Sequence, residues 1–193
     1  MKSKIPSISV FFPCYNDAGS IGLLVQDAKS LLKTLTNDFE IIVVDDGSKD
    51  ESRKILQRLK REVKELKLVF HKENLGYGGA LKSGFKAATK DFVFYTDGDG
   101  QYSVLELSKL IDKLDGSVDV VQGYKLERHD PWYRLIIGKS YHIFSKIMFG
   151  LKVRDVDCDF RLIRRKILEK VDLEYNSGVI CVELVKKLQD KKC

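Results

Sequence analysis

The sequence has little of what marks secreted, zinc-binding or membrane-spanning proteins. Its four cysteines are scattered and form no Cys-x-x-Cys pair, so neither a disulfide framework nor a zinc site is indicated. No stretch approaches the ~18 consecutive apolar residues that span a bilayer, and residues 1–6 lack the apolar segment of a signal peptide. We therefore expect reduced thiols and a cytoplasmic protein, which can meet a membrane only from its surface.

An excess of charge of one sign is also missing from most of the chain. Residues 1–122 hold 18 basic and 18 acidic side chains, whereas residues 123–193 hold 16 basic and 10 acidic ones. A neutral region followed by a basic one suggests two regions that bind different ligands, the second of them anionic. Zinc-finger spacing, an RNA-binding aromatic signature and a long Lys/Arg run are all missing, which argues against nucleic acid as that ligand.

Proline is scarce as well, and no Pro/Gly-rich linker or internal repeat divides the 193 residues, of which 44% are hydrophobic. This size and composition fit a single domain with a sizeable core. Short β-branched and aromatic runs predict strands, and apolar residues at three- and four-residue steps between them predict amphipathic helices. Ser48 and Glu51 stand in capping-box spacing ahead of the second helix. The predicted strands are 8–12, 40–44, 68–71, 92–96 and 118–121. The predicted helices begin near 21, directly after Ser48, near 80 and near 107, with a last one over 177–188.

This alternation predicts an α/β fold, a mostly parallel Rossmann-like sheet covered by helices on both faces. The rhythm ends at residue 123, and no strand is predicted beyond it. We expect one domain over residues 1–193 with two functional regions, 1–122 and 123–193.

Two acidic clusters follow predicted strands. Asp45 and Asp46 come after the second, and Asp97 and Asp99 come after the fourth. Ligands of a parallel α/β sheet bind outside the carboxyl ends of its strands, and carboxylates two residues apart on a glycine-containing turn can bind one Mg²⁺ or Mn²⁺ that also contacts substrate phosphates. Either cluster alone could be an ordinary turn, but two at one edge of the sheet favour a site.

A glycine-rich turn, residues 74–80, follows the third predicted strand. It does not match a dinucleotide fingerprint, because Leu81 stands where the third glycine is required. Its backbone at Gly78 and the nearby Lys82 could still bind a phosphate, or the turn could be purely structural.

Asp97-Gly98-Asp99 after an apolar strand also allows a haloacid-dehalogenase-type phosphatase, with Asp97 as the nucleophile and Asp99 as the acid/base. Gln101 stands where that pattern has Thr or Ser, and Asp45 and Asp46 would have no role. We keep this as a minor alternative.

Four motifs follow one another in the first region, and a fifth group of residues follows in the later segment. The four motifs are Pro13-Cys14-Tyr15-Asn16-Asp17, Val43-Val44-Asp45-Asp46-Gly47-Ser48, Asn74-Leu75-Gly76 with Gly78 and Ala80, and Asp97-Gly98-Asp99-Gly100-Gln101. The later segment carries Gly123-Tyr124-Lys125, Arg128, Arg134, Ser140 and Asp155-Val156-Asp157-Cys158-Asp159-Phe160-Arg161. Taken in order, the four motifs resemble those of family 2 glycosyltransferases with the GT-A fold, and the later segment resembles the polyprenyl-phosphate branch of that family, the dolichol-phosphate mannosyltransferase group.

For the first region, this resemblance implies a nucleotide-sugar donor, UDP- or GDP-linked, bound together with Mg²⁺ or Mn²⁺. The implied base and ribose contacts are Pro13, Tyr15, Asp17 and Asp45, with Asp46 close by. The implied metal ligands on the diphosphate are Asp97, Asp99 and Gln101.

For the second region, the resemblance implies an acceptor site for the phosphate of a polyprenyl lipid, which would bring the protein to the cytoplasmic face of a membrane. Lys125, Arg128, Arg134 and Ser140 are the implied phosphate contacts. The implied activity is an inverting hexosyl transfer, in which Asp155 organises the acceptor loop. A saccharide acceptor is the first alternative, and it would require one of Asp155, Asp157 or Asp159 to deprotonate its hydroxyl. A non-catalytic nucleotide-binding module is another.

The sequence departs from the family pattern at three places. Asp17 stands where relatives usually carry Glu, and Asp159 replaces the usual Gly, which puts the local loop geometry in doubt. The chain ends where relatives continue into a further strand and a basic segment, so we expect it to be either C-terminally truncated or a minimal version of the family domain. The identity of the sugar and the oligomeric state are not predicted.

Overall fold

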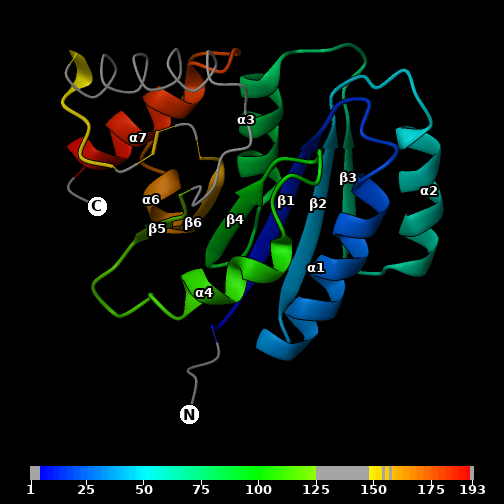
Figure 1. Ribbon diagram of the computed structural model, residues 1–193, viewed down its shortest axis with the longest axis horizontal. Coiled ribbons are helices and arrows are strands. Elements are labelled where there is room, and N and C mark those ends of the chain that lie inside the picture. The colour runs from blue at the N-terminus through cyan, green and yellow to red at the C-terminus, as the bar shows by residue number, and fades with distance from the viewer. Residues whose placement is uncertain (1–4, 125–147, 154, 157, 192–193) are drawn as a thin grey trace, which may run out of the picture.

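The computed structural model describes residues 5–124, 148–153, 155–156 and 158–191. Its centre is one six-stranded sheet in the order β3-β2-β1-β4-β6-β5 (Figure 1). The first four strands of the chain run parallel, β6 is antiparallel to β4, and β5 is antiparallel to β6. The mostly parallel α/β sheet predicted from the sequence is therefore confirmed. The strands are β1 (Ile8–Cys14), β2 (Phe39–Asp45), β3 (Leu66–Phe70), β4 (Phe92–Thr96), β5 (Val120–Gln122) and β6 (Phe160–Arg164).

Helices cover both faces of this sheet. Successive side chains of its buried strands point to opposite faces, and since most of them are apolar, each face needs helices to cover it. Val10 and Phe12 of β1 pack in one core with α1, α2 and α4, whereas Phe11 packs in a second core with α3 and α7. The helices are α1 (Ile21–Leu35), α2 (Ser52–Glu62), α3 (Tyr77–Ala87), α4 (Leu107–Ile111) after the 3₁₀ turn η1 (Val104–Glu106), α6 (Arg165–Leu168) and α7 (Ile180–Asp190). No helix in the described ranges combines the length and the apolar character needed to cross a bilayer.

The strand β6 was not predicted, because Arg161 interrupts its apolar run. This arginine is 0% exposed and hydrogen bonds inside the protein, so the charge that hides the strand in the sequence is internal. The strand lies between β4 and β5, and thus joins the second half of the chain to the sheet of the first half.

The predicted capping box is wrong. Helix α2 begins at Ser52, whose N–H donates to Asp50 Oδ1 at 3.0 Å. Ser48 instead accepts a hydrogen bond through its hydroxyl from the N–H of Asn16, 3.0 Å away. This serine therefore joins two loops at the edge of the sheet rather than capping a helix.

The carboxyl ends of β1, β2 and β4 lie at one edge of the sheet, where their loops meet the turn before α3. Cys14 is opposite Asp45 in the register, and the N–H of Asp46 donates to the carbonyl of Cys14 at 2.9 Å. Gly47 has φ +75°, and a Cβ there would lie 2.7 Å from the backbone of Glu73. Glycine thus allows the loop after β2 to rest directly on the loop after β3.

Candidate active site

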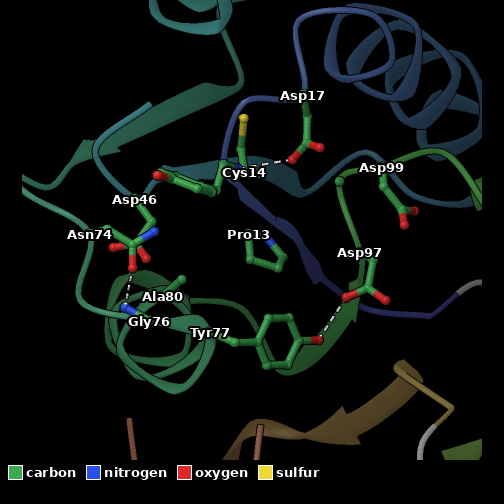
Figure 2. Close-up of a pocket in the computed structure, with 12 residues that line it drawn as sticks. Pro13, Cys14, Asp17, Asp46, Asn74, Gly76, Tyr77, Ala80, Asp97 and Asp99 are labelled. Atoms are coloured by element: carbon green, nitrogen blue, oxygen red, sulfur yellow. Dashed lines mark hydrogen bonds between the residues drawn. The ribbon is translucent and has the colours of Figure 1, made fainter. Parts of the chain in front are cut away.

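A pocket of about 300 Å³ opens at this edge of the sheet (Figure 2). It brings together six of the residues predicted from the sequence as donor or metal contacts, which come from the ends of three different strands. Its lining is Pro13, Cys14, Tyr15, Asp17, Asp46, Asn74, Gly76, Tyr77, Ala80, Asp97, Gly98 and Asp99. In Figure 2, Asp17, Asp97 and Asp99 lie on one side of Pro13 and Asp46 lies on the other.

Local hydrogen bonds hold Asp97 and Asp99 in place. The Tyr77 hydroxyl donates to Asp97 Oδ1 at 2.7 Å, and the N–H of Gln101 donates to Asp99 Oδ1 at 2.9 Å. A Cβ on Gly98 would lie 2.4 Å from the carbonyl oxygen of Pro13. Only glycine lets the loop after β4 lie against the end of β1, which places both carboxylates in the pocket.

Asp17 lies on the same side of the pocket. Burial raises the pKa of its carboxyl above the usual value, and the negative charge of Asp99 raises it further, while a hydrogen bond from the N–H of Tyr15, at 2.9 Å, lowers it. Two neighbouring negative charges repel each other, and a cation bound between them relieves that repulsion. This side of the pocket is therefore negative, and a cation bound there would be stabilised.

A divalent cation fits this wall only with help from a ligand. Among the described residues, no three His, Cys, Asp or Glu side chains form a cluster that could hold a metal ion by themselves. Mg²⁺ usually binds one or two carboxylates and takes its other oxygens from water and substrate phosphates, which is what Asp97 and Asp99 can offer. Gln101 is exposed and does not line the pocket, so its role as a third ligand stays a prediction.

The two aspartates after β2 have different roles. Asp45 is 0% exposed and does not line the pocket; its Oδ2 accepts hydrogen bonds from Arg53 Nε at 2.8 Å and from a terminal guanidinium nitrogen at 2.5 Å. This ion pair ties the start of α2 to β2. Asp46 lines the pocket instead, although the sequence led us to expect Asp45 as the ligand contact with Asp46 close by. The ligand contact of either residue stays a prediction.

The two residues predicted to bind a phosphate at the glycine-rich turn, Gly78 and Lys82, contact protein instead, although Asn74, Gly76, Tyr77 and Ala80 of the same stretch line the pocket. The N–H of Gly78 donates to the carbonyl of Asn176 at 2.8 Å, and a Cβ at Gly78 would lie 2.4 Å from the carbonyl of Tyr175. Lys82 Nζ likewise donates to the carbonyl of Glu174 at 3.1 Å. Neither residue lines the pocket, so these contacts favour a structural role for Gly78 and Lys82.

Helix α7 holds the loop that covers this turn. Glu183 Oε1 accepts from the N–H of Glu174 at 2.9 Å, and Oε2 accepts from the N–H of Tyr175 at 3.2 Å. Burial raises the pKa of Glu183, but its ion pair with Lys187 and these hydrogen bonds lower it by more, so the net shift is downward.

The predicted acceptor residues are described only in part. Lys125, Arg128, Arg134 and Ser140, together with Asp157, lie outside the described residues. Asp155 is buried, and its carbonyl accepts a hydrogen bond from the Gln122 side chain.

Asp159 has a clear structural partner. Its Oδ1 lies 2.7 Å from Arg161, which also donates to the Tyr95 hydroxyl and, at 2.6 Å, to the carbonyl of Val156. The thiol of Cys181 on α7 completes the set at 3.2 Å from Asp159 Oδ2. The carboxylate at a position where the family pattern has glycine is thus the counter-ion of a buried arginine.

Sequence reasoning missed one residue that lines the pocket, one that contacts its wall and one buried arginine in β6. Tyr77 was hidden in the glycine-rich turn, and His71, which contacts Asp46, was counted only as the end of a strand. The signal for Tyr77 was its position at the beginning of a helix that starts at the sheet edge. For Arg161 the signal was an arginine within an otherwise apolar run.

Comparison with known proteins identifies the chain's relatives. The sequence profile of glycosyl transferase family 2 matches residues 9–172. The chain belongs to that family. This family 2 glycosyltransferase is 29% identical over 167 residues to the undecaprenyl-phosphate 4-deoxy-4-formamido-L-arabinose transferase of Yersinia enterocolitica. The alignment covers 86% of this chain and 51% of that protein. The enzyme of the same name from an Enterobacter species is 31% identical over 166 residues, with the same coverage. The chain spans about half the length of these curated relatives.

Solved structures confirm the GT-A fold of this family 2 chain. Glucosyl-3-phosphoglycerate synthase from Mycobacterium tuberculosis, in complex with UDP, superposes with a TM-score of 0.73 at 17% identity, covering 96% of this chain and 66% of that one. A mannosyltransferase from Pyrobaculum calidifontis, in complex with GDP-mannose and Mn²⁺, gives a TM-score of 0.60 at 20% identity, covering 92% and 51%. Family membership decides against the phosphatase alternative for Asp97 and Asp99.

Proposed function

We propose that this chain transfers a sugar from a UDP- or GDP-linked donor to the phosphate of a polyprenyl lipid, with a divalent cation bound at Asp97 and Asp99 and with inversion at the anomeric carbon. The observation that carries the proposal is the single pocket wall that Asp17, Asp97 and Asp99 share. A donor diphosphate beside this wall would need a cation between itself and the carboxylates. Structural neighbours crystallised with UDP, or with GDP-mannose and Mn²⁺, support a donor of this class.

The acceptor part of the proposal is supported by the names of the relatives, which specify undecaprenyl phosphate. The basic residues of the second region are consistent with it, since residues 123–154 hold 7 basic and 2 acidic side chains. A lipid phosphate would bring the protein to a membrane surface, where anionic headgroups attract such residues. The relatives' names specify an arabinose derivative, a five-carbon sugar, so they do not support the expected hexose, and we leave the sugar unspecified.

In the proposed reaction, an oxygen of the lipid phosphate attacks the anomeric carbon as the bond to the donor diphosphate breaks. The attacking oxygen is already ionised near neutral pH, so no side chain has to remove a proton. When bound, the cation neutralises charge on the leaving diphosphate. Asp97 and Asp99 would hold that cation, Asp46 and Tyr15 contact the nucleoside, Asp155 organises the acceptor loop, and Lys125 and Arg134 bind the acceptor phosphate.

The test offers radiolabelled UDP- and GDP-sugars, with and without Mn²⁺, to the purified protein together with either undecaprenyl phosphate or a saccharide acceptor. We expect Mn²⁺-dependent label in the lipid fraction. Label that appears only in the saccharide fraction would contradict the lipid acceptor, and nucleotide binding without turnover of any donor would indicate a non-catalytic module.

Two matched variants test the pocket itself. Asp99→Asn removes a carboxylate from the pocket wall, and Asp27→Asn removes an exposed one on α1, outside the pocket. We expect the first to lose at least 100-fold in activity, in the range reported for the loss of one group that stabilises transition-state charge, and the second to keep it. Equal activity of the two variants would rule out the assigned cation site.

A further inference from the structure

Behind Asp46 lie two side chains, His71 and Ser83, that the proposed reaction does not use, and with Asp46 they form a hydrogen-bonded chain of three. His71 Nδ1 lies 2.6 Å from Asp46 Oδ1, and His71 Nε2 lies 2.8 Å from the hydroxyl of Ser83. Asp46 is 2% exposed and His71 is 9% exposed. Asp46 follows β2, His71 follows β3 and Ser83 lies on α3, so the three residues converge from separate elements of the fold.

The chemistry of these groups sets the direction of the hydrogen bonds. A carboxylate only accepts, so Nδ1 of His71 carries a proton and donates it to Asp46. In the neutral ring, Nε2 is then an acceptor, and the Ser83 hydroxyl donates to it. Ser83 thereby holds the ring in the plane that His71 needs to reach Asp46.

Asp46 Oδ1 also accepts from the N–H of Leu75, at 2.9 Å. Two donors from different directions on one oxygen fix the plane of the carboxylate. This carboxylate lies at the pocket wall opposite Asp97 and Asp99 (Figure 2), where it would repel a diphosphate but accept from N–H or O–H groups.

We propose that His71, supported by Ser83, is a positioning residue that orients Asp46 to accept a hydrogen bond from the nucleoside of the donor. The proposal rests on the function proposed above, because it assumes that a nucleotide occupies this pocket. It assigns to His71 an effect on the affinity for the nucleoside, without an effect on the chemical step, since the nucleoside is remote from the bond that breaks.

A matched pair of variants separates the two hydrogen bonds of the histidine. In His71→Asn the amide nitrogen stands at the same number of bonds from Cα as Nδ1, so it can still donate to Asp46. In His71→Gln the amide nitrogen stands at the position of Nε2, so it reaches toward Ser83 and leaves Asp46 without this donor. The dissociation constants of UDP and GDP, each with Mn²⁺, are measured by calorimetry, and Mn²⁺-pyrophosphate serves as the probe without a nucleoside.

We expect His71→Gln to weaken binding of the preferred nucleotide about 10-fold, which corresponds to one hydrogen bond of about 1.4 kcal/mol. His71→Asn keeps the affinity within about 3-fold, and neither variant changes pyrophosphate binding. In turnover, His71→Gln raises the KM for the donor and leaves kcat in place. Combined with Asp46→Asn, it adds no further loss, because both variants remove the same contact.

The outcomes distinguish the two proposals. If the wild-type protein binds neither nucleotide, the proposed function fails. If the wild-type protein binds a nucleotide, any one of three results shows that the positioning role is wrong. The first is a His71→Gln dissociation constant equal to that of the wild type, and the second is a loss of nucleotide affinity in His71→Asn as large as in His71→Gln. The third is an equal fall in the affinity for pyrophosphate. Circular dichroism checks that the variants fold. If His71→Gln does not fold, Ser83→Ala replaces it, and we expect that variant to bind the nucleotide about 3-fold more weakly. An unchanged dissociation constant in Ser83→Ala would overturn the role.

Discussion

The buried pair of Asp159 and Arg161 allows a quantitative test of the core. Arg161 is 0% exposed, and burial lowers the pKa of its guanidinium, but Tyr95 and Asp159 raise it by more, so the net shift is upward and the group stays charged. Asp159→Ala removes the only described carboxylate in contact with that charge. The Tyr95 hydroxyl and the Val156 carbonyl remain as acceptors, but neither carries a compensating charge.

Removing one partner of a buried ion pair costs about 3–5 kcal/mol, because the other charge stays in a low-dielectric interior. For a domain of this size, each kcal/mol lowers the melting temperature by about 2–4 °C. Asp159→Ala is therefore expected to melt about 6–20 °C below the wild type. Such a loss is a large fraction of the total free energy of unfolding, about 5–15 kcal/mol for a typical domain.

The decisive comparison is with the double variant Asp159→Ala/Arg161→Met. Replacing both charges with apolar groups removes the cost of burying them, so we expect the double variant to be more stable than Asp159→Ala by at least about 2 kcal/mol. The assay is urea denaturation followed by circular dichroism at pH 7. A double variant that is less stable than Asp159→Ala would refute the argument, because it would show that the arginine stabilises the core without its counter-ion.

Three further predictions concern other parts of the fold. Burial raises the pKa of Glu40, but its ion pair with Lys67 and its hydrogen bonds lower it by more, so the net shift is downward from 4.5. The ionised carboxylate therefore stabilises the protein above that pH. Urea denaturation should show Glu40→Gln about 1–3 kcal/mol less stable at pH 7, with the difference shrinking as the pH falls below 4.5; a constant difference would contradict this. Tyr77→Phe removes the hydrogen bond to Asp97, so calorimetry should show Mn²⁺ binding to the nucleotide complex weakened about 10-fold with an unchanged melting temperature; equal Mn²⁺ affinity would exclude this support. Gly84→Ala places a Cβ 2.4 Å from the Phe11 ring, so we expect a loss of about 1–3 kcal/mol in thermal unfolding although alanine favours helices, and a stabilised variant would show that the ring can move away.

Much of the sheet could be predicted because β1, β2 and β4 are buried on both faces and read as continuous apolar runs. The strand β6 could not, because the partners that make Arg161 acceptable in the interior lie far from it in the chain or depend on the fold. Hydrophobicity along the chain therefore predicts burial of apolar side chains, but it does not predict burial of a charged side chain such as Arg161, which needs a counter-ion supplied by the fold.

The site shows the same limit at the level of single residues. The motifs placed Asp46 and Asp97 at one edge of the sheet, and the pocket confirms that they come together. Which of two adjacent aspartates faces the pocket was not predictable, because it depends on Arg53, which holds Asp45 from the following helix. The occupation of Gly78 by Asn176 was equally hidden, since the two are almost 100 residues apart in the chain.

The position of β6 between β4 and β5 has a consequence for the order of folding. Phe92 pairs with Arg164 in the register, and β5 is joined to the sheet only through β6. On the ribosome, therefore, residues 1–122 can form a four-stranded parallel sheet, but the edge of β4 stays bare until residues 160–164 have left the exit tunnel. An unpaired edge of this kind is a template for association with other chains. The part of the chain that carries the pocket thus gains its last sheet partner for β4 only when the later part pairs with it.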